Sequence, residues 1–366
     1  GNHNTVVGAS AGYNISTGAY NVAVGSATLD GNTTGEKNTA IGSMALGDQT
    51  TGDYNTALGF QALKYNTTAN ENTGIGFQAL LTNTTGTRNV AVGAYALDAN
   101  TSASRNTAVG WQALTSNTTG YYNTALGDAA MEATTTGHHS VAVGQAALAV
   151  NTTGAGNTAV GALALDANTT GGYNTSIGEN SLTANTTGTQ NLCMGSNAGA
   201  QTNGSGNTYG GFYSGKDSDT GNYNTALGHY AFSSNQNGTT SGSNNTAVGV
   251  NTLKVVSTGD NNTAIGNGAG IYITTGDNNT MLGRGSGGNS SPSGQVTGGD
   301  NIVCIGNNSV VDIFCADTSI SSSDSRDKTD VTDFTKGLDW IKALRPVTYR
   351  WDRRTWYGTD AEPYGT

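Results

Sequence analysis

Short apolar stretches alternate along this chain with turns rich in asparagine, threonine and glycine. The unit NTAVGALALDANTTGGY at residues 157–173 contains two such stretches, Thr-Ala-Val and Leu-Ala-Leu, separated by Gly161. β-Branched residues favour a strand, Gly161 permits a positive φ, and Asn-Thr-Thr-Gly is typical turn chemistry. The pattern predicts two strands and two turns in each unit. Gly, Asn and Thr recur every few residues, and this composition disfavours a helix.

One glycine position repeats along most of the chain. Successive copies lie 17 residues apart at Gly8, Gly25, Gly42, Gly59, Gly76, Gly93, Gly110, Gly127, Gly144, Gly161, Gly178 and Gly195. Further copies follow with small insertions or deletions at Gly211, Gly228, Gly249, Gly266, Gly283 and Gly306. A short fixed period predicts a solenoid rather than a globular enzyme. We therefore predict an all-β fold over residues 1–306, a β-solenoid or parallel β-roll of 17-residue coils. Stacked at ~4.8 Å, these coils would make a rod about 85 Å long.

The alternation of side chains assigns faces to the first strand of each coil. Counted from the Asn that begins the motif Asn-Thr-Ala-Val-Gly, the side chains at the second and fourth positions point the same way. The second is Thr107 or Val90 in representative coils, and the fourth is Val, Ile, Leu or Met. We expect this face to fill the coil, and the small Asn, Ala and Gly positions to form an outer face that meets other chains. The longest irregular stretch, residues 285–299, is expected to bulge from the rod as a loop.

Composition and charge narrow the classes of function. Charged residues are 11% of the chain, and the net charge is −10, so there is no basic surface for nucleic acid. No apolar run is long enough to insert into a membrane. The chain begins at Gly1 without Met, and we expect a fragment of a longer protein. Cys193 and Cys304 stand where other coils have Ala, which predicts small buried thiols rather than a disulfide framework with Cys315.

The character of the chain changes near Ile320. Residues 323–366 carry 8 of the 15 Lys and Arg residues, although they are a small part of the chain. Apolar residues then recur at helical spacing from Phe334 to Leu344 until Pro346 ends the pattern, and residues 347–351 alternate like a strand. We predict a linker over 307–322 and, over 323–366, a short α+β segment that begins another domain.

The repeat resembles the head of YadA-like trimeric adhesins, a left-handed parallel β-roll built on the motif Asn-Ser-Val-Ala-Ile-Gly. The nearest copies here are Asn-Ile-Val-Cys-Ile-Gly, which ends at Gly306, and Ser-Val-Ala-Val-Gly, which ends at Gly144. The resemblance covers about residues 1–306, and the 17-residue period is longer than that of the usual head repeats. It implies stacked coils in a homotrimer.

The C-terminal segment is similar to the start of the endosialidase-type intramolecular chaperone domain of phage tail fibres and tailspikes. The matching residues are Ser-Asp-Ser-Arg-Asp-Lys at 323–328, followed by Leu338, Trp340, Ile341, Leu344, Val347, Tyr349 and Trp351. The resemblance implies that this segment helps three chains to trimerise. It also implies single-turnover autoproteolysis by Ser323 as nucleophile and Lys328 as base. A lysine whose pKa is lowered by burial could remove the proton of the serine hydroxyl.

Nothing in the repeats predicts a metal site, a cofactor site or a catalytic carboxylate pair. His138 and His139 are expected in a solvated turn, and no two acidic residues recur together in each coil. Aromatic residues at the coil bends could pack within the turns or stack against sugar rings: Tyr54, Trp111, Tyr122, Tyr173 and Tyr223.

We therefore expect a structural and adhesive segment of a phage tail fibre. It would be located in the virion, extracellular after assembly in the host cytoplasm. Its partners would be two further copies of the chain, other tail-fibre or baseplate proteins, and a glycan or protein of the host surface. Two alternatives stay open: a tailspike that degrades polysaccharide, and a solenoid that binds ice or serves as a bacterial surface adhesin.

Overall fold

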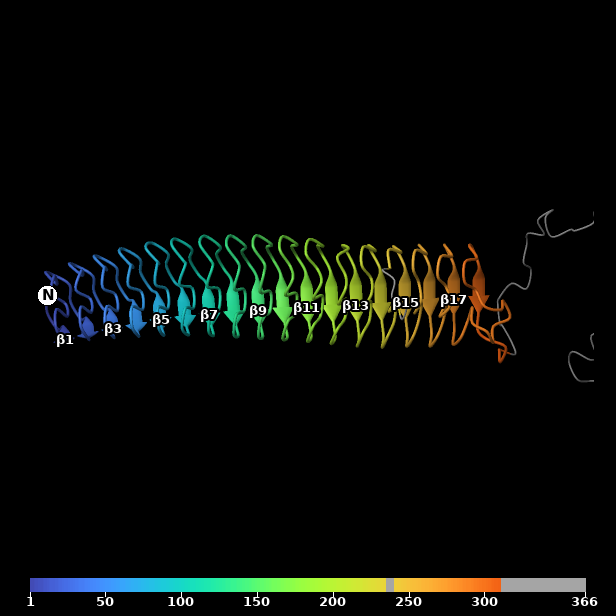
Figure 1. The fold of residues 1–366 in the computed structure, drawn as a ribbon, viewed down its shortest axis with the longest axis horizontal. Coiled ribbons are helices and arrows are strands. Elements are labelled where there is room, and N and C mark those ends of the chain that lie inside the picture. The colour runs from blue at the N-terminus through green and yellow to red at the C-terminus, as the bar shows by residue number, and fades with distance from the viewer. Residues whose placement is uncertain (235–239, 311–366) are drawn as a thin grey trace, which may run out of the picture. The chain divides into compact units, whose positions relative to one another are not determined.

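A computed structural model describes residues 1–234 and 240–310, and these residues form a solenoid of stacked coils (Figure 1). Within these ranges the regular secondary structure consists of three-residue strands without a helix. The strands are β1 (Thr5–Val7), β2 (Val22–Val24), β3 (Thr39–Ile41), β4 (Thr56–Leu58), β5 (Thr73–Ile75), β6 (Val90–Val92), β7 (Thr107–Val109), β8 (Thr124–Leu126), β9 (Val141–Val143), β10 (Thr158–Val160), β11 (Thr175–Ile177), β12 (Leu192–Met194), β13 (Thr208–Gly210), β14 (Thr225–Leu227), β15 (Thr246–Val248), β16 (Thr263–Ile265), β17 (Thr280–Leu282) and β18 (Val303–Ile305).

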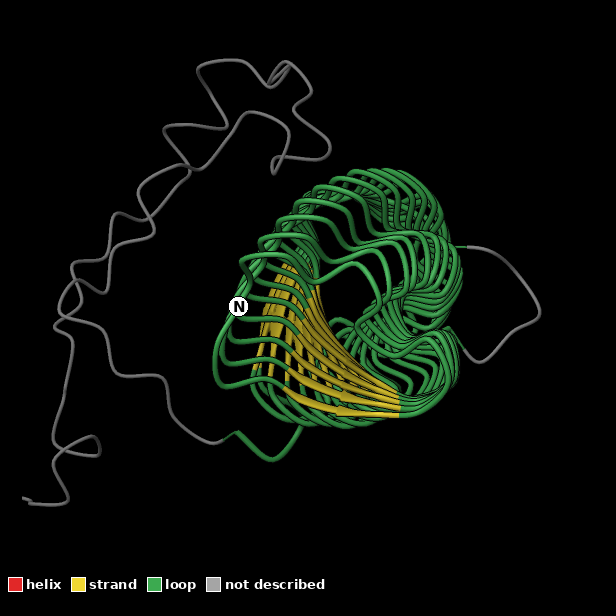
Figure 2. Ribbon diagram, turned by 90° about the vertical axis from the view of Figure 1, so that its left-hand side faces the viewer, coloured by secondary structure: helices red, strands yellow, loops and turns green. Residues whose placement is uncertain are grey.

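Each strand pairs in parallel with the corresponding strand of the next coil. Thr107 lies opposite Thr124, and Val109 lies opposite Leu126. The same register continues from β1 to β18 and makes one 18-stranded sheet. Figure 2, which looks along the solenoid, shows this sheet on one side of the coil and turns around the rest. The predicted all-β parallel solenoid is confirmed.

The prediction of two strands in each coil is wrong. In the second apolar stretch, Leu163 and Leu165 have φ values of +55° and +54°, so the backbone alternates between left-handed and right-handed regions. This stretch still bonds from coil to coil, because Leu163 N donates to Gln145 O at 3.0 Å and Leu165 N donates to Ser181 O at 3.0 Å. Stacking therefore continues there without a strand.

The glycine after each strand makes the bend that the sequence predicts. Gly110 has a φ of +140°, and a Cβ atom built on it would lie 2.2 Å from the carbonyl oxygen of Gly127 in the next coil. Any side chain would therefore collide with neighbouring backbone. The 17-residue recurrence of this glycine follows from the close approach of successive bends.

The predicted assignment of the strand faces is inverted. Ala108, in the middle of β7, is completely buried, as is Asn106 just before the strand. The outer positions of the strand face away from the core, and Leu126 at the end of β8 is 47% exposed. In most coils a buried Leu of the following turn fills the space beside the strand, which leaves room for Ala at the inward position. The fourth position is also not always apolar, because β13 ends at Gly210.

Two positions of each coil share one space in the core, so a large residue at one position goes with a small residue at the other. Most coils place Ala in the strand and a buried Leu in the following turn. Where the strand carries Tyr209 or Met281, the turn position is Gly215 or Gly287. A Cβ on Gly215 would lie 2.4 Å from the Tyr209 ring, so the two positions share one space. The buried residues Cys193 and Cys304 are free thiols in the alanine position, as predicted.

Two ladders of buried asparagine run along the core. In the first, Asn89 Nδ2 donates to Ala103 O at 2.8 Å, and Asn89 Oδ1 accepts from the backbone N–H of Asn106 at 3.0 Å. In the second, Asn83 Nδ2 donates to Gly86 O at 2.9 Å and to Asn66 Oδ1 at 2.8 Å. The ladders satisfy backbone groups that the short strands leave unpaired.

The irregular stretch at residues 285–299 packs back onto the last coils, contrary to the prediction of a bulging loop. Ser291 and Val296 are each only 4% exposed, and Ser291 Oγ lies 2.8 Å from Cys304 Sγ. The predicted linker at 307–322 lies mostly outside the described residues. The segment 323–366, with its predicted helix and strand, lies outside them entirely, so this division into domains stays a prediction.

Candidate functional site

The predicted catalytic pair, Ser323 and Lys328, lies outside the described residues, so its geometry stays a prediction. Within residues 1–234 and 240–310, no three His, Cys, Asp or Glu side chains gather as a metal site would require. The same ranges contain no helix long and apolar enough to cross a membrane. Candidate sites in this part of the chain are therefore surfaces of the solenoid.

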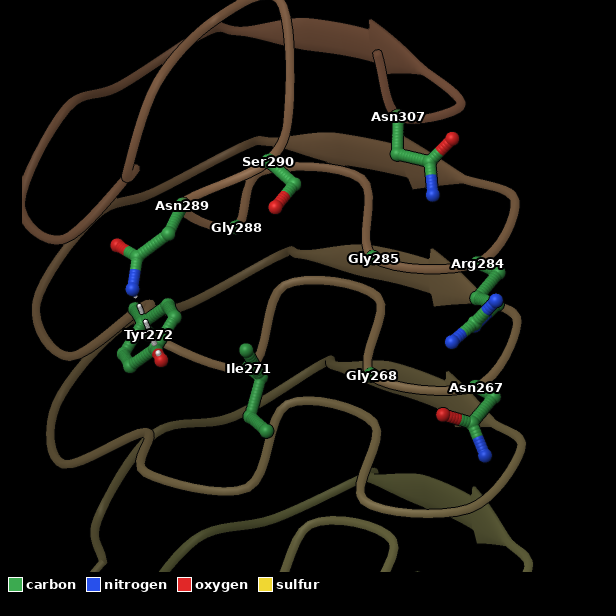
Figure 3. Close-up of a pocket in the computed structure, with 10 residues that line it drawn as sticks. All are labelled: Asn267, Gly268, Ile271, Tyr272, Arg284, Gly285, Gly288, Asn289, Ser290 and Asn307. Carbon is green, nitrogen blue, oxygen red and sulfur yellow. Dashed lines mark hydrogen bonds between the residues drawn. The ribbon is translucent and has the colours of Figure 1, made fainter. Parts of the chain in front are cut away.

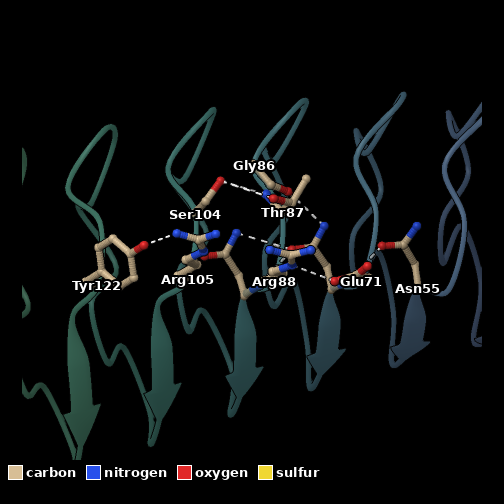
Figure 4. Close-up of polar contacts among 10 residues, drawn as sticks. Asn55, Glu71, Gly86, Thr87, Arg88, Ser104, Arg105 and Tyr122 are labelled. Carbon is tan, nitrogen blue, oxygen red and sulfur yellow. Dashed lines mark hydrogen bonds and ion pairs between the residues drawn. The ribbon is translucent and has the colours of Figure 1, made fainter.

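The corner before each strand carries an exposed ladder of polar and aromatic side chains (Figure 4). Arg88 Nε donates to Glu71 Oε2 at 2.7 Å, and Arg105 bonds the hydroxyl of Tyr122. The bond to Glu71 raises the pKa of Arg88. Each group sits at the same position of consecutive coils, so the charges meet partners within the ladder.

Lys37 in this corner ladder makes the same kind of contact. Its Nζ donates to the Tyr54 hydroxyl at 2.7 Å, and this bond raises the pKa of Lys37. His139 stacks on Tyr122 with ring centroids 5.1 Å apart, in the exposed turn that the sequence predicts. The basic side chains Lys37, Arg88 and Arg105 thus each have a partner within this corner ladder, either a carboxylate or a tyrosine hydroxyl.

The aromatic residues at this corner do not form a continuous row. Tyr173 is 71% exposed and Tyr223 is 66% exposed, and the coil before each has a glycine at the same position, Gly156 and Gly206. A Cβ on Gly156 would lie 2.9 Å from the Tyr173 ring. These tyrosines therefore pack over the neighbouring turn, and the corner offers no continuous platform for a sugar chain.

The opposite bend, just after each strand, carries the larger aromatic groups. Phe60 and Phe77 stack at 5.5 Å, and Tyr95 meets Phe77 edge-on at 5.2 Å. Trp111 is 51% exposed at the corresponding position of β7's coil. Aromatic surface left in water on a rod is a feature of binding sites as well as of turn packing.

A second aromatic cluster occupies the bend near β13 and β14. Phe212 stacks on His229 at 5.5 Å, and Tyr213 stacks on Tyr230 at 5.1 Å. The ring pairs also meet edge-on, with Phe212 and Tyr213 4.1 Å apart. Each ring therefore contacts both its chain neighbour and the next coil, which fixes the cluster in place.

Two lysines flank this second cluster. Lys216 Nζ lies 4.9 Å from the centre of the Tyr213 ring, and Lys254 Nζ lies 5.2 Å from that of Tyr230. Both lysines stand five residues after a bend glycine. Burial raises the pKa of neighbouring Asp217, and the charge of Lys216 lowers it in part. The cluster is thus an aromatic surface with two cations at its edge.

A hollow of about 330 Å³ opens farther along the same bend (Figure 3). Its lining comes from three consecutive coils and from the irregular stretch: Asn267, Gly268, Ile271, Tyr272, Arg284, Gly285, Gly288, Asn289, Ser290 and Asn307. Asn289 Nδ2 donates to the Tyr272 hydroxyl at 3.3 Å. No carboxylate is in this lining, so the hollow lacks the acid pair that a glycosidase requires.

Sequence reasoning missed this hollow, although a signal for it is present. Most coils carry a side chain two residues after the bend glycine, as at Tyr230 and Asn251, but the last two complete coils have Gly268 and Gly285 there. Glycine in place of a side chain at one repeat position indicates cleared space.

Comparison with known protein families gives a match to the C-terminal segment. Residues 323–364 match the family model described as chaperone of endosialidase. No curated protein matches the chain. The matched residues include Ser323 and Lys328, and the β-solenoid before them fits a tail-fibre-like protein. Over residues 323–364, therefore, the chain is similar to the chaperone family of phage tail proteins.

Proposed function

We propose that this chain is a segment of a phage tail fibre or tailspike, a stiff rod that assembles as a homotrimer and attaches to the host surface. The match of residues 323–364 to the endosialidase chaperone, directly after a long β-solenoid, is the observation that carries the proposal. In the virion the rod would contact other tail-fibre or baseplate proteins. We also propose that the repeat is related to the YadA-like heads that it resembles.

The outward row of strand residues supports a contact between copies. The large side chains at the third strand position are 38–58% exposed at Val7, Ile41, Leu58, Leu126, Ile177, Met194, Leu227, Ile265, Leu282 and Ile305. They make an uncharged strip along the sheet. The strip is three residues wide, at ~3.3 Å per residue, and 17 coil spacings long, at ~4.8 Å per coil. Its footprint on the surface is therefore about 800 Å².

That area is comparable with the roughly 800 Å² that one partner contributes to a standard interface. Most strands begin with Thr, so the apolar part of the strip is mainly the row of residues that end the strands. The proposed contact is therefore the Thr/Val face of the strand. Of the Asn, Ala and Gly positions assigned to contacts from the sequence, Asn and Ala are buried inside the coil and the bend glycine is half-buried.

The proposal is tested by placing charge in the strip. The double variant Leu126→Lys/Ile177→Lys should lower the trimer fraction and the melting temperature, because each interface would bury several unpaired ammonium groups. Tyr173→Lys/Tyr223→Lys is the matched control, since both tyrosines are exposed at the corner outside the strip. Sedimentation equilibrium and light scattering of the whole chain measure the assembly. Equal trimer stability in the two double variants would refute this contact surface.

A further inference from the structure

We propose that the bend side of the last coils binds a carboxylate-bearing sugar chain, with the hollow at Arg284 as its main subsite. The proposal rests on the attachment function proposed above and specifies the class of ligand. The surface, named here the bend strip, consists of Phe212, Tyr213, Lys216, His229, Tyr230, Lys254, Asn267, Arg284 and Asn307. With coils ~4.8 Å apart, it extends for about 24 Å along the rod.

Arg284 is the cation without a partner in the hollow. The other basic side chains of the described residues pair with an acid or lie over a tyrosine ring, as Arg88 does with Glu71 and Lys37 with Tyr54. Arg284 is exposed, and within the described residues it makes neither an ion pair nor a cation–π contact. A guanidinium presents donors in a fork that fits a carboxylate in two places.

The glycines of the hollow leave space that the backbone does not require. Gly268 has a φ of +67°, but Tyr230 and Asn251 hold the same repeat position at +53° and +55°. A Cβ built on Gly268 meets no atom within 4 Å, and one built on Gly285 meets Asn307 at 3.9 Å. Side chains would therefore fit here, and their absence opens the floor beside Arg284.

The rest of the lining suits a sugar ring. Asn267 and Asn307 offer amides on the same side of the hollow as Arg284, and across the hollow Asn289 offers an amide and Ser290 and Tyr272 offer hydroxyls (Figure 3). Ile271 adds apolar surface. A ligand with one negative group and many hydroxyls matches this mixture better than an apolar molecule or a bare anion would.

Away from the hollow, the bend strip carries further cations and aromatic rings. Lys216, Lys254 and Arg284 belong to alternate coils, so neighbouring cations are about 10 Å apart along the rod. This spacing is comparable with the length of one disaccharide unit of an extended chain. The aromatic cluster lies between and beside the two lysines, and flat rings can stack on the faces of sugars. A linear polysaccharide with regularly spaced carboxylates would meet these groups in turn.

Binding of defined polysaccharides by the whole chain tests the proposal. The probes are polygalacturonate, alginate and hyaluronate, with dextran as the neutral control. We expect binding to at least one carboxylated probe, weakened by salt, and none to dextran. Arg284→Gln should weaken binding about tenfold to hundredfold, as expected for the loss of a charge-assisted pair. Arg105→Gln removes the same charge from the opposite corner and should leave binding near wild type.

A second variant blocks the hollow without removing charge. Gly268→Tyr copies the residue that Tyr230 places at this position, so the fold should be retained, and binding should fall at least tenfold. Leu163→Tyr makes the same side chain at the same repeat position in a distant coil and should have no effect. Circular dichroism checks that both variants fold.

The possible results separate this inference from the proposed fibre. If the chain forms trimers but binds no carboxylated probe, or if Gly268→Tyr and Arg284→Gln bind like wild type, the bend strip is not the site and the fibre proposal stands. If the variants lose binding although the chain is monomeric, the site stands and the trimer proposal fails.

Discussion

The second asparagine ladder has a defect that yields a quantitative prediction. At the position of Asn83, Asn100 and Asn117, the next coil carries Thr134. Thr134 Oγ1 and Asn117 Oδ1 are both buried without a hydrogen-bond partner. Thr134→Asn would supply an amide that reaches Asn117 Oδ1 and the carbonyl three residues ahead, as the intact rungs do.

The expected gain follows from the contacts of an intact rung. Asn83 Nδ2 makes bonds of 2.8 and 2.9 Å, and its Oδ1 accepts from Asn100 Nδ2 at 2.7 Å. A net hydrogen bond contributes about 0.5–1.5 kcal/mol, and an unsatisfied buried group costs about 1–3 kcal/mol. We expect Thr134→Asn to stabilise the neighbouring coils by about 1–3 kcal/mol. The reverse change at an intact rung, Asn83→Thr, should destabilise them by a similar amount.

Hydrogen exchange measured by mass spectrometry is the suitable assay. Long repeat arrays do not unfold as one two-state unit, so the free energy of local opening is more informative than a global midpoint. Peptides covering residues 117–151 should exchange more slowly in Thr134→Asn, and those around residue 83 should exchange faster in Asn83→Thr. Unchanged exchange in both variants would refute the view that side-chain ladders hold the coils together.

Three further predictions concern single groups. Burial raises the pKa of Asp98, whose Oδ1 accepts from Thr115 Oγ1 at 2.6 Å. Stability from this site therefore falls as pH rises through the raised folded pKa. At pH 7 the coil of Asp98 should have a higher free energy of local opening by hydrogen exchange in Asp98→Asn than in wild type, and the two values should converge below about pH 4. In a Cys315→Ser background, a thiol reagent should modify Cys304 before Cys193. Burial raises the pKa of both thiols, but bonds to Ser291 and Ser293 bring the pKa of Cys304 below its ordinary value; equal rates would contradict this. If Ser323 and Lys328 cleave the chain, Ser323→Ala should keep its full mass by mass spectrometry, whereas a wild-type chain of equally full mass would argue against cleavage.

The repeat period made the stacked coils predictable from the sequence. One glycine recurs every 17 residues because a Cβ at that bend would strike the next coil, as the value for Gly110 shows. Turn chemistry was also predictable, since asparagines such as Asn83 bond a carbonyl three residues ahead. These features depend on local geometry that each coil repeats.

Which strand face is buried was not predictable from alternation alone. Alternation separates Thr107 and Val109 from Asn106 and Ala108, but it does not say which pair lies inside. The apolar pair was the natural choice, yet the strand turns Asn and, in most coils, Ala toward the interior, where the buried Leu of the following turn fills the remaining space. The uniformity of Asn and Ala, beside the variation of Thr, Val and Leu, was the better guide. The hollow at Arg284 escaped prediction because it depends on residues of three coils meeting in space.

The central proposal is that three copies of this solenoid assemble along the uncharged strips of their strands. Electron microscopy of the purified whole chain, with class averages viewed along the rod, tests this claim most directly. Three-fold symmetry is expected, with the β-sheets of the three rods facing the common axis. Single unpaired rods, two-fold particles, or trimers with the sheets turned outward would contradict it.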